Sequence, residues 1–120
     1  MIKLKSKVQK LVDPAFNYTA NVFFEFTHWH MSNSGYIAEF RYFYEEGEGE
    51  NKTEKTISYL AFNRHVSFDQ VNAIASTITR DPNLNYVQEE IRFLTFGALA
   101  IIGTDKPFGL TAEDWDIIEE

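Results

Sequence analysis

The sequence predicts one α+β domain in which the strands come first and the helices follow. Apolar and polar residues alternate through the first half of the chain, as they do in half-buried strands. From residue 67 onward, apolar residues recur three and four positions apart, which is helical spacing. A run of strands followed by a run of helices favours an antiparallel sheet over a parallel βαβ arrangement. We therefore expect a four-stranded antiparallel β-meander over residues 1–62, two α-helices packed on one face over 67–103, and a loop with a short acidic C-terminal tail over 104–120.

Length and composition set the class of protein. The chain has 120 residues, 44% of them hydrophobic, enough for one core that buries roughly two-thirds of the surface of the unfolded chain. It contains no cysteine, so disulfides, zinc–thiolate sites and thiol catalysis are excluded. The longest apolar run, residues 96–103, is far shorter than the roughly 20 residues that span a bilayer. Residues 1–12 lack the apolar core of a signal peptide. We expect a soluble protein, cytoplasmic or part of a virion, without membrane contact.

The first predicted strand covers residues 2–12. Ile2 and Leu4 fall on one side of it and lysines on the other. The Asp13-Pro14 pair ends the strand, because proline donates no ladder hydrogen bond and favours a turn.

A long hairpin forms the predicted centre of the sheet, with strands at residues 18–30 and 36–45. Its register follows from the rule that cross-strand neighbours match in character. Pairing Glu25 with Arg41 satisfies this rule, whereas a slip of two residues one way sets Glu25 against another glutamate. The same register aligns these further pairs: Phe26–Phe40, Phe24–Tyr42, Val22–Tyr44, Phe23–Phe43, Trp29–Ile37 and His30–Tyr36.

The two flanking strands of the meander are placed by the same rule. A short connection sets Lys5 beside Glu25, which predicts a Lys5–Glu25–Arg41 ladder across three strands. The fourth strand, at 55–62, follows a loop rich in glycine and glutamate, residues with poor β-propensity. The remaining predicted pairs are Leu4–Phe26, Val8–Val22, Phe40–Leu60, Arg41–Tyr59 and Glu45–Lys55.

Two helices are predicted after the strands. Ser67 and Gln70 have the spacing of a capping box, which starts the first helix. Residues 80–83 contain an Asp-Pro pair and end it. The second helix is expected over 84–102, with Gly103 as its C-cap.

Charge is segregated along the chain, whose formal net charge is −7. An acidic balance of this kind disfavours binding to nucleic acid. The first strand is basic, whereas the loop at 45–50 and the tail at 113–120 are acidic. Thr111 is expected to cap a short helical turn in this tail. Such segregation suits electrostatic complementarity between subunits, or with a basic site that the acidic segments occupy as phosphate mimics.

His28 and His30 are the sharpest candidates for chemistry. Residues two apart on a strand share a face, so both imidazoles could bind one metal ion with His65 as a third ligand. The alternative is a pair of partly solvated rings beside Tyr36. The sequence has no nucleophile elbow, phosphate-binding loop or calcium loop. We therefore predict no catalytic residue, no cofactor and no enzymatic activity.

The sheet face that the helices leave uncovered is the predicted interface. Aromatic residues ringed by charge are the composition of protein–protein interfaces, and an uncovered apolar patch favours association. The tail is expected to dock on the same chain or on a neighbouring one. The predicted interface residues are Phe23, Trp29, Ile37, Phe43, Tyr59, Lys5, Arg41, Trp115, Ile117 and Ile118.

Together these observations predict a non-enzymatic structural or assembly protein, a protomer whose partners are protein subunits. These partners are copies of itself or other components of the assembly. Small acidic α+β proteins with apolar tails occur among bacteriophage virion neck and tail components, which is an analogy of type and not of motif. Two alternatives stand beside this prediction. One is a metal- or small-ligand-binding domain centred on His28, His30 and His65, and the other is an acidic inhibitor that mimics nucleic acid.

Overall fold

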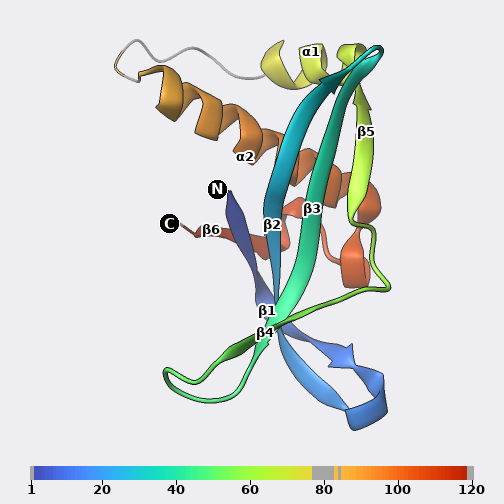
Figure 1. Cartoon of the computed structure of the whole chain (residues 1–120), viewed down its shortest axis with the longest axis vertical. Helices are drawn as coiled ribbons and strands as arrows, with labels where there is room; N and C mark the ends of the chain where they lie inside the picture. The colour runs from blue at the N-terminus through green and yellow to red at the C-terminus, as the bar shows by residue number, and fades with distance from the viewer. Residues whose placement is uncertain (1, 77–82, 84, 119–120) are drawn as a thin grey trace.

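The computed structural model describes residues 2–76, 83 and 85–118. It is an antiparallel sheet of six strands with one long helix across one face (Figure 1). The strands are β1 (Lys3–Asp13), β2 (Tyr18–Ser32), β3 (Gly35–Glu46), β4 (Thr53–Thr56), β5 (Asn63–Ser67) and β6 (Trp115–Ile118). The helices are α1 (Phe68–Ser76) and α2 (Tyr86–Asp105), and short 3-10 turns lie at Pro14–Phe16, Pro107–Gly109 and Ala112–Asp114.

The predicted four-stranded meander with two packed helices is wrong. The strand order is β4-β3-β2-β1-β6, and β5 also pairs with β3. The single fourth strand expected at 55–62 is instead two short strands, β4 and β5, which pair with opposite ends of β3. Between β4 and β5 the chain does not continue as a strand beside β3. It stays attached to β3 through the Ile57 N–H, which donates to the Tyr42 carbonyl at 2.8 Å. A strand as long as β3 can thus carry two successive partners on one edge.

The C-terminal segment is a strand, where a helical turn was predicted. The Asp114 carboxylate accepts the Thr111 N–H at 2.9 Å, as in a capping box, but this cap serves a single 3-10 turn. After it, Trp115 and Ile117 alternate with a polar residue, which is strand periodicity. The segment forms β6 and pairs antiparallel with β1 of the same chain.

The predicted register of β2 and β3 is confirmed from Phe23 to Phe26. Phe23 pairs with Phe43 and Glu25 with Arg41, and the pairs Phe24–Tyr42 and Phe26–Phe40 are also as expected. A β-bulge between Phe26 and His28 then shifts the pairing of all later residues of β2 by one position along β3. The predicted partners of Trp29 and His30 are therefore wrong, because one extra residue moves every later side chain to the opposite face. The pairs beyond the bulge include Trp29–Ala38, His30–Ile37 and Met31–Tyr36.

The register of β1 differs from the prediction by two residues over Lys3–Lys5, whereas residues 9–11 keep the predicted register. Lys3, where Lys5 was expected, lies opposite Glu25, so the ladder across three strands is Lys3–Glu25–Arg41. A second irregularity follows Lys5, where Ser6 is buried. The Ser6 hydroxyl accepts the Val22 N–H at 2.8 Å and donates to the Val8 carbonyl at 2.7 Å. These bonds replace the ladder locally and leave Val8 exposed, so the predicted Val8–Val22 pair is wrong.

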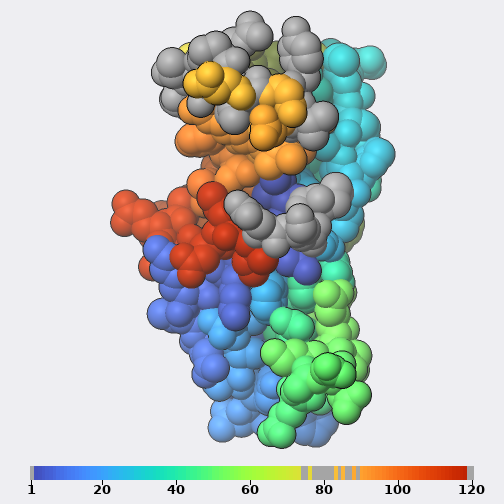
Figure 2. Space-filling model, turned by 90° about the vertical axis from the view of Figure 1, so that its left-hand side faces the viewer, coloured from blue at the N-terminus to red at the C-terminus, as the bar shows by residue number. Residues whose placement is uncertain are grey.

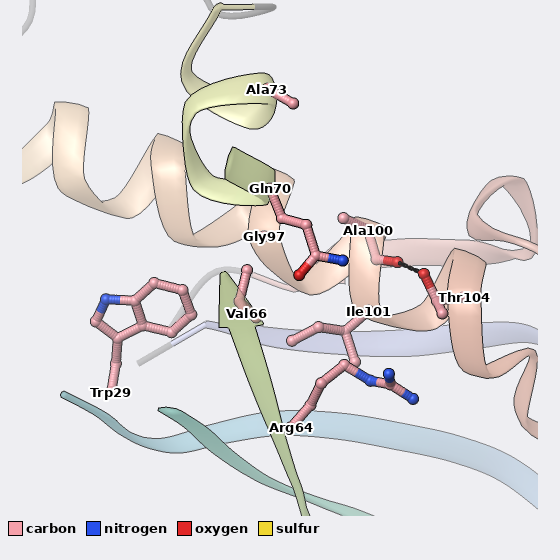
Figure 3. Close-up of a pocket in the computed structure, with 9 residues that line it drawn as sticks. All are labelled: Trp29, Arg64, Val66, Gln70, Ala73, Gly97, Ala100, Ile101 and Thr104. Carbon is pink, nitrogen blue, oxygen red and sulfur yellow. Dashed lines mark hydrogen bonds between the residues drawn. The ribbon is translucent and has the colours of Figure 1, made fainter. Parts of the chain in front are cut away.

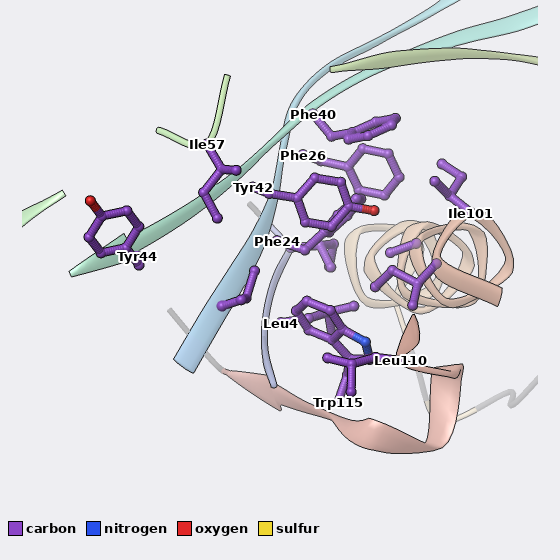
Figure 4. Packing of buried hydrophobic residues seen from close by; sticks show 14 of the residues in the cluster. Leu4, Phe24, Phe26, Phe40, Tyr42, Tyr44, Ile57, Ile101, Leu110 and Trp115 are labelled. Atoms are coloured by element: carbon purple, nitrogen blue, oxygen red, sulfur yellow. The ribbon is translucent and has the colours of Figure 1, made fainter. Parts of the chain in front are cut away.

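The core lies between α2 and one face of the sheet, which we call the inner face; the opposite face is the outer face. Aromatic side chains of β2 and β3 pack edge to face here, with Phe24 and Tyr42 at 5.3 Å between ring centroids. Ile101 of α2 and Trp115 of β6 close over them (Figure 4). The other buried members are Ile2, Leu4, Val12, Ala20, Val22, Phe26, Ala38, Phe40, Tyr44, Ile57, Ala98, Ile102 and Leu110.

The helices begin at capping boxes. The Ser67 hydroxyl accepts the Gln70 N–H at 3.2 Å, which confirms the predicted cap of α1. Asn85 and Gln88 form a second box at the start of α2. This helix ends at Asp105, and its C-cap is Lys106, in the left-handed region, not Gly103 as predicted. The predicted stop at 80–83 lies outside the described residues except for Asn83, and so does Leu84.

Two hairpins extend beyond α2, at the end of the sheet away from α1 (Figure 1). We call them the β1–β2 arm (residues 9–21) and the β3–β4 arm (residues 44–55), and the end that they form the arm end. The radius of gyration is 15.3 Å, above the about 13.6 Å expected for a compact domain of this length. In Figure 2 the arms make up the lower part of the molecule, below the C-terminal segment drawn in red. The elongation, 45 Å along the longest axis, therefore comes with arms that lie outside the helical layer.

Candidate functional site

The outer face carries the predicted aromatic pair, but the pair is covered. Phe23 and Phe43 stack at 5.0 Å between centroids and are 8% and 1% exposed. Lys5 lies over the Phe23 ring at 5.6 Å, and Arg41 lies over the Phe43 ring at 4.1 Å. The aliphatic stems of these cations shield the rings from water, as long basic side chains commonly do. The outer face thus presents a charged surface and little apolar area.

Arg41 is at the centre of this charged surface. Its Nε donates to Glu25 at 3.1 Å and its terminal nitrogen donates to Glu54 at 2.6 Å, while Lys3 lies 3.9 Å from Glu25. Burial opposes the charge of the guanidinium, but the hydrogen bonds to Glu54 and Glu25 outweigh it and raise the pKa of Arg41. These pairs satisfy one another within the chain, so the surface is largely self-neutralised.

The other predicted interface residues are not gathered on the outer face. Trp29 is on the inner face, stacked on Tyr36 at 5.0 Å, because the β-bulge reverses the side to which it points. Trp115 is buried in the core, 5% exposed. Tyr59 donates its hydroxyl to the Val12 carbonyl at 3.3 Å. The remaining members are Ile37, half-buried on the outer face of the upper sheet, Ile118, opposite Lys3 at the β6 edge, and Ile117, 57% exposed on the inner side of that edge.

The acidic tail docks on its own chain. Its strand β6 pairs with the basic β1, and Lys7 lies 4.0 Å from Asp116. Of the two arrangements that the sequence leaves open, the structure has the one within the chain. Part of the charge complementarity seen in the sequence is therefore used for folding.

The three histidines do not converge. His28 and His30 lie together on the outer face with ring centroids 4.9 Å apart. His65 is opposite Ile37, which is itself opposite His30, so it lies two strands away, about 10 Å at the usual strand spacing. It shares a hydrogen bond of 2.9 Å with Ser34. Within residues 2–76, 83 and 85–118, no three side chains of His, Cys, Asp or Glu come close enough to hold a metal ion.

A cavity of about 220 Å³ lies between β5, α1 and α2 (Figure 3). Its walls are mostly apolar, and Gly97 of α2 opens it, because a Cβ there would meet no atom within 4 Å. We call it the Trp29 pocket. Its lining residues are Trp29, Arg64, Val66, Gln70, Ala73, Gly97, Ala100, Ile101 and Thr104.

The Trp29 pocket has a polar end. Arg64 forms an ion pair with Asp105 of α2, but its Nε and the second carboxylate oxygen of Asp105 are buried without a partner among the described residues. Figure 3 shows the Gln70 amide reaching down from α1 toward the same region. Such a pocket can hold a small apolar group that also hydrogen-bonds. Sequence reasoning missed it, because no local motif links β5 to the distant end of α2.

The arm end exposes large apolar side chains. Phe16, in the turn of the β1–β2 arm, is 83% exposed, and Val8 and Leu11 of β1 are 46% and 41% exposed. The β3–β4 arm ends in the acidic loop predicted from the sequence, with Glu48 and neighbouring glutamates in solvent.

Comparison with protein-family models, with curated proteins and with solved structures finds no match to this chain. Across the part of the chain that the structure describes, no helix has the length and apolar character needed to cross a membrane.

Proposed function

We propose that this chain is a non-enzymatic subunit of a protein assembly and that it contacts its neighbours through the arm end. The observation that carries the proposal is Phe16, 83% exposed in the turn of a hairpin that extends beyond the helical layer. A two-stranded hairpin that no helix covers gains little stability from its own chain. A projection that presents aromatic and aliphatic groups to solvent is typical of an interaction site.

The proposal moves the contact from the outer face to the arm end. On the outer face, Phe23 and Phe43 are already covered by Lys5 and Arg41, so a partner would gain little apolar burial there. Burial of Phe16 and Leu11 would give several times more. Aromatic side chains of this kind dominate the energetics of interfaces.

The neighbour that fits best is a second copy of the chain. The acidic β3–β4 arm and the lysines of β1 meet at the same end, where Lys5 and Gly47 line one shallow groove. A two-fold axis at this end would place the acidic arm of one copy against the β1 lysines of the other. The charge would then fix the orientation, while Phe16 supplies the buried area.

Sedimentation velocity tests this proposal. The wild-type chain should change from monomer to a defined oligomer as its concentration rises, and Phe16→Ser should shift that change to higher concentration. Phe62→Ser is the matched control, because Phe62 is 67% exposed but lies outside both arms. A wild-type chain that stays monomeric at all concentrations, or equal effects of the two substitutions, would contradict the proposal.

The Trp29 pocket supports a second candidate function, binding of a small molecule with an apolar body and a hydrogen-bonding end. The observation that favours it is the pair of buried atoms without a partner, Arg64 Nε and Asp105 Oδ2, beside an apolar cavity of about 220 Å³. Ligand-observed NMR with a fragment library would detect binding. Gly97→Leu should fill the cavity and abolish it, whereas Gly103→Leu, on the exposed side of α2, should not. Fragments that bind both variants equally would exclude this pocket as their site.

A further inference from the structure

A groove of about 380 Å³ lies between the two arms, on the inner face where no helix covers the sheet. The β1–β2 arm supplies Asp13, Phe16 and Tyr18, and the β3–β4 arm supplies Tyr44, Glu46 and Lys55. Its volume falls within the range of about 300–1,000 Å³ that is usual for ligand sites. We call it the arm groove. We propose that it binds an organic cation, the ammonium of a lysine or the guanidinium of an arginine, presented by the neighbouring copy.

This inference rests on the proposed function, since it names the chemistry that the arm end recognises. The groove has an aromatic wall. The rings of Tyr18 and Tyr44 pack at 5.6 Å with a tilt of 41°, and Phe16 stands beside them in the turn. The face of an aromatic ring is electronegative and attracts a cation within about 6 Å of its centroid. Three rings around one groove form the type of cage that binds ammonium groups.

The groove also carries two carboxylates, those of Asp13 and Glu46. Neither Asp13 nor Glu46 forms an ion pair with any residue in the part of the chain that the structure describes. Burial, followed by the charges of these two carboxylates, raises the pKa of Tyr44, as expected where the potential is negative. A cation that enters the groove would meet both carboxylates at a site partly shielded from water.

The Tyr44 hydroxyl is a further polar group of the residues that line the groove. The Tyr44 side chain is 7% exposed, and within the described residues its hydroxyl makes no hydrogen bond. By contrast, Tyr18 donates its hydroxyl to the Glu45 carbonyl at 3.5 Å. A phenol oxygen of this kind can accept a hydrogen bond from an ammonium or a guanidinium.

Lys55 lines the same groove, and the effect of replacing it distinguishes a cation site from an anion site. Its side chain is exposed and forms no ion pair with Asp13 or Glu46. Two carboxylates and one ammonium leave the groove with a net negative charge. Lys55 should therefore compete with an incoming cation, and its removal should strengthen cation binding. If the groove instead recognised a carboxylate, Lys55 would be essential.

The test uses the whole chain and small probes, measured by NMR on the aromatic signals of Phe16, Tyr18 and Tyr44. The probes are N-acetyl-lysine methylamide and N-acetyl-arginine methylamide. N-acetyl-norleucine methylamide, which has an uncharged side chain, is the control. The cationic probes should give saturable shifts that weaken with added salt, and the neutral probe should give none.

Four variants locate the site. Asp13→Asn and Glu46→Gln should each weaken binding about two- to fivefold, the effect of one partly exposed charge. Glu48→Gln, a glutamate of the same arm that does not line the groove, should leave it unchanged. Lys55→Met should strengthen binding by a similar factor.

Three results would overturn the inference: no shift with either cation, equal shifts with the norleucine probe, or loss of binding in Lys55→Met. Sedimentation separates this failure from failure of the proposed function. A chain that oligomerises but does not bind the cations would keep the assembly proposal and lose the groove. A chain that binds the cations but stays monomeric would keep the site and exclude a second copy as the source of the cation.

Discussion

Replacement of Trp115 tests whether β6 is an integral part of the fold. The residue is 5% exposed and packs beside Tyr42 at 6.3 Å between ring centroids. A tryptophan buries about 200 Å², which at about 25 cal/mol per Å² corresponds to about 5 kcal/mol of transfer free energy. Its indole N–H is buried without a partner among the described residues, which offsets about 1 kcal/mol of that value. Trp115→Ala should therefore lower the free energy of unfolding by about 3–5 kcal/mol, as measured for large core residues.

Urea denaturation followed by circular dichroism at low protein concentration measures this loss. The matched control is Ile117→Ala in the same strand, where the side chain is 57% exposed and the loss should be below about 1 kcal/mol. An equal, small effect of both substitutions would refute the reasoning, because it would mean that Trp115 is not buried by its own chain. A strong dependence of the Trp115→Ala effect on protein concentration would point instead to docking on a neighbouring copy.

Two further predictions concern single polar groups. Ser6→Ala leaves the buried Val22 N–H without its acceptor and should lower the free energy of unfolding by about 1–3 kcal/mol in urea titrations, whereas Ser58→Ala, at an exposed position, should have almost no effect. The hydrogen bond from the Thr111 backbone lowers the pKa of Asp114. The stability from this cap is thus present above the ordinary aspartate pKa of about 3.9 and is lost as the pH falls through the lowered value. Asp114→Asn should remove that part of the acid dependence of the unfolding free energy, and an unchanged pH profile would contradict the role of the cap.

The centre of the sheet could be predicted because charge and aromatic character agree there. Glu25 tolerates only one partner among the neighbouring positions of β3, and that partner, Arg41, fixes the register of the pairs around it. The bulge near Thr27 could not be predicted in the same way. On either side of it both faces carry aromatic rings, so Trp29 fits the pattern of one face as well as His28 and His30 do. An alternating pattern shows to which face of a sheet a side chain points only when the two faces differ in polarity.

Tertiary contacts decided the remaining elements. Ser6 is a small polar residue in an alternating strand, and the sequence does not show that its hydroxyl replaces a ladder bond. Thr111 and Asp114 do form a cap, but the length of the structure after a cap depends on what the following side chains can pack against. Trp115 reaches the core only in an extended chain beside β1, so burial prevailed over the local helical signal.

The position of the candidate site follows from these differences between the predicted and the observed fold. The single-residue shift near Thr27 puts Trp29 under α2, and the docking of β6 uses Trp115 in the core, so two of the largest predicted interface residues became part of the fold. Phe16 stays in solvent because it lies in the turn of an arm, beyond the end of α2. The arm groove joins this turn to the β3–β4 arm, two segments that pair with different strands and share no sequence motif. A site assembled from two hairpin ends is determined by how far each hairpin extends, and that length depends on the whole sheet.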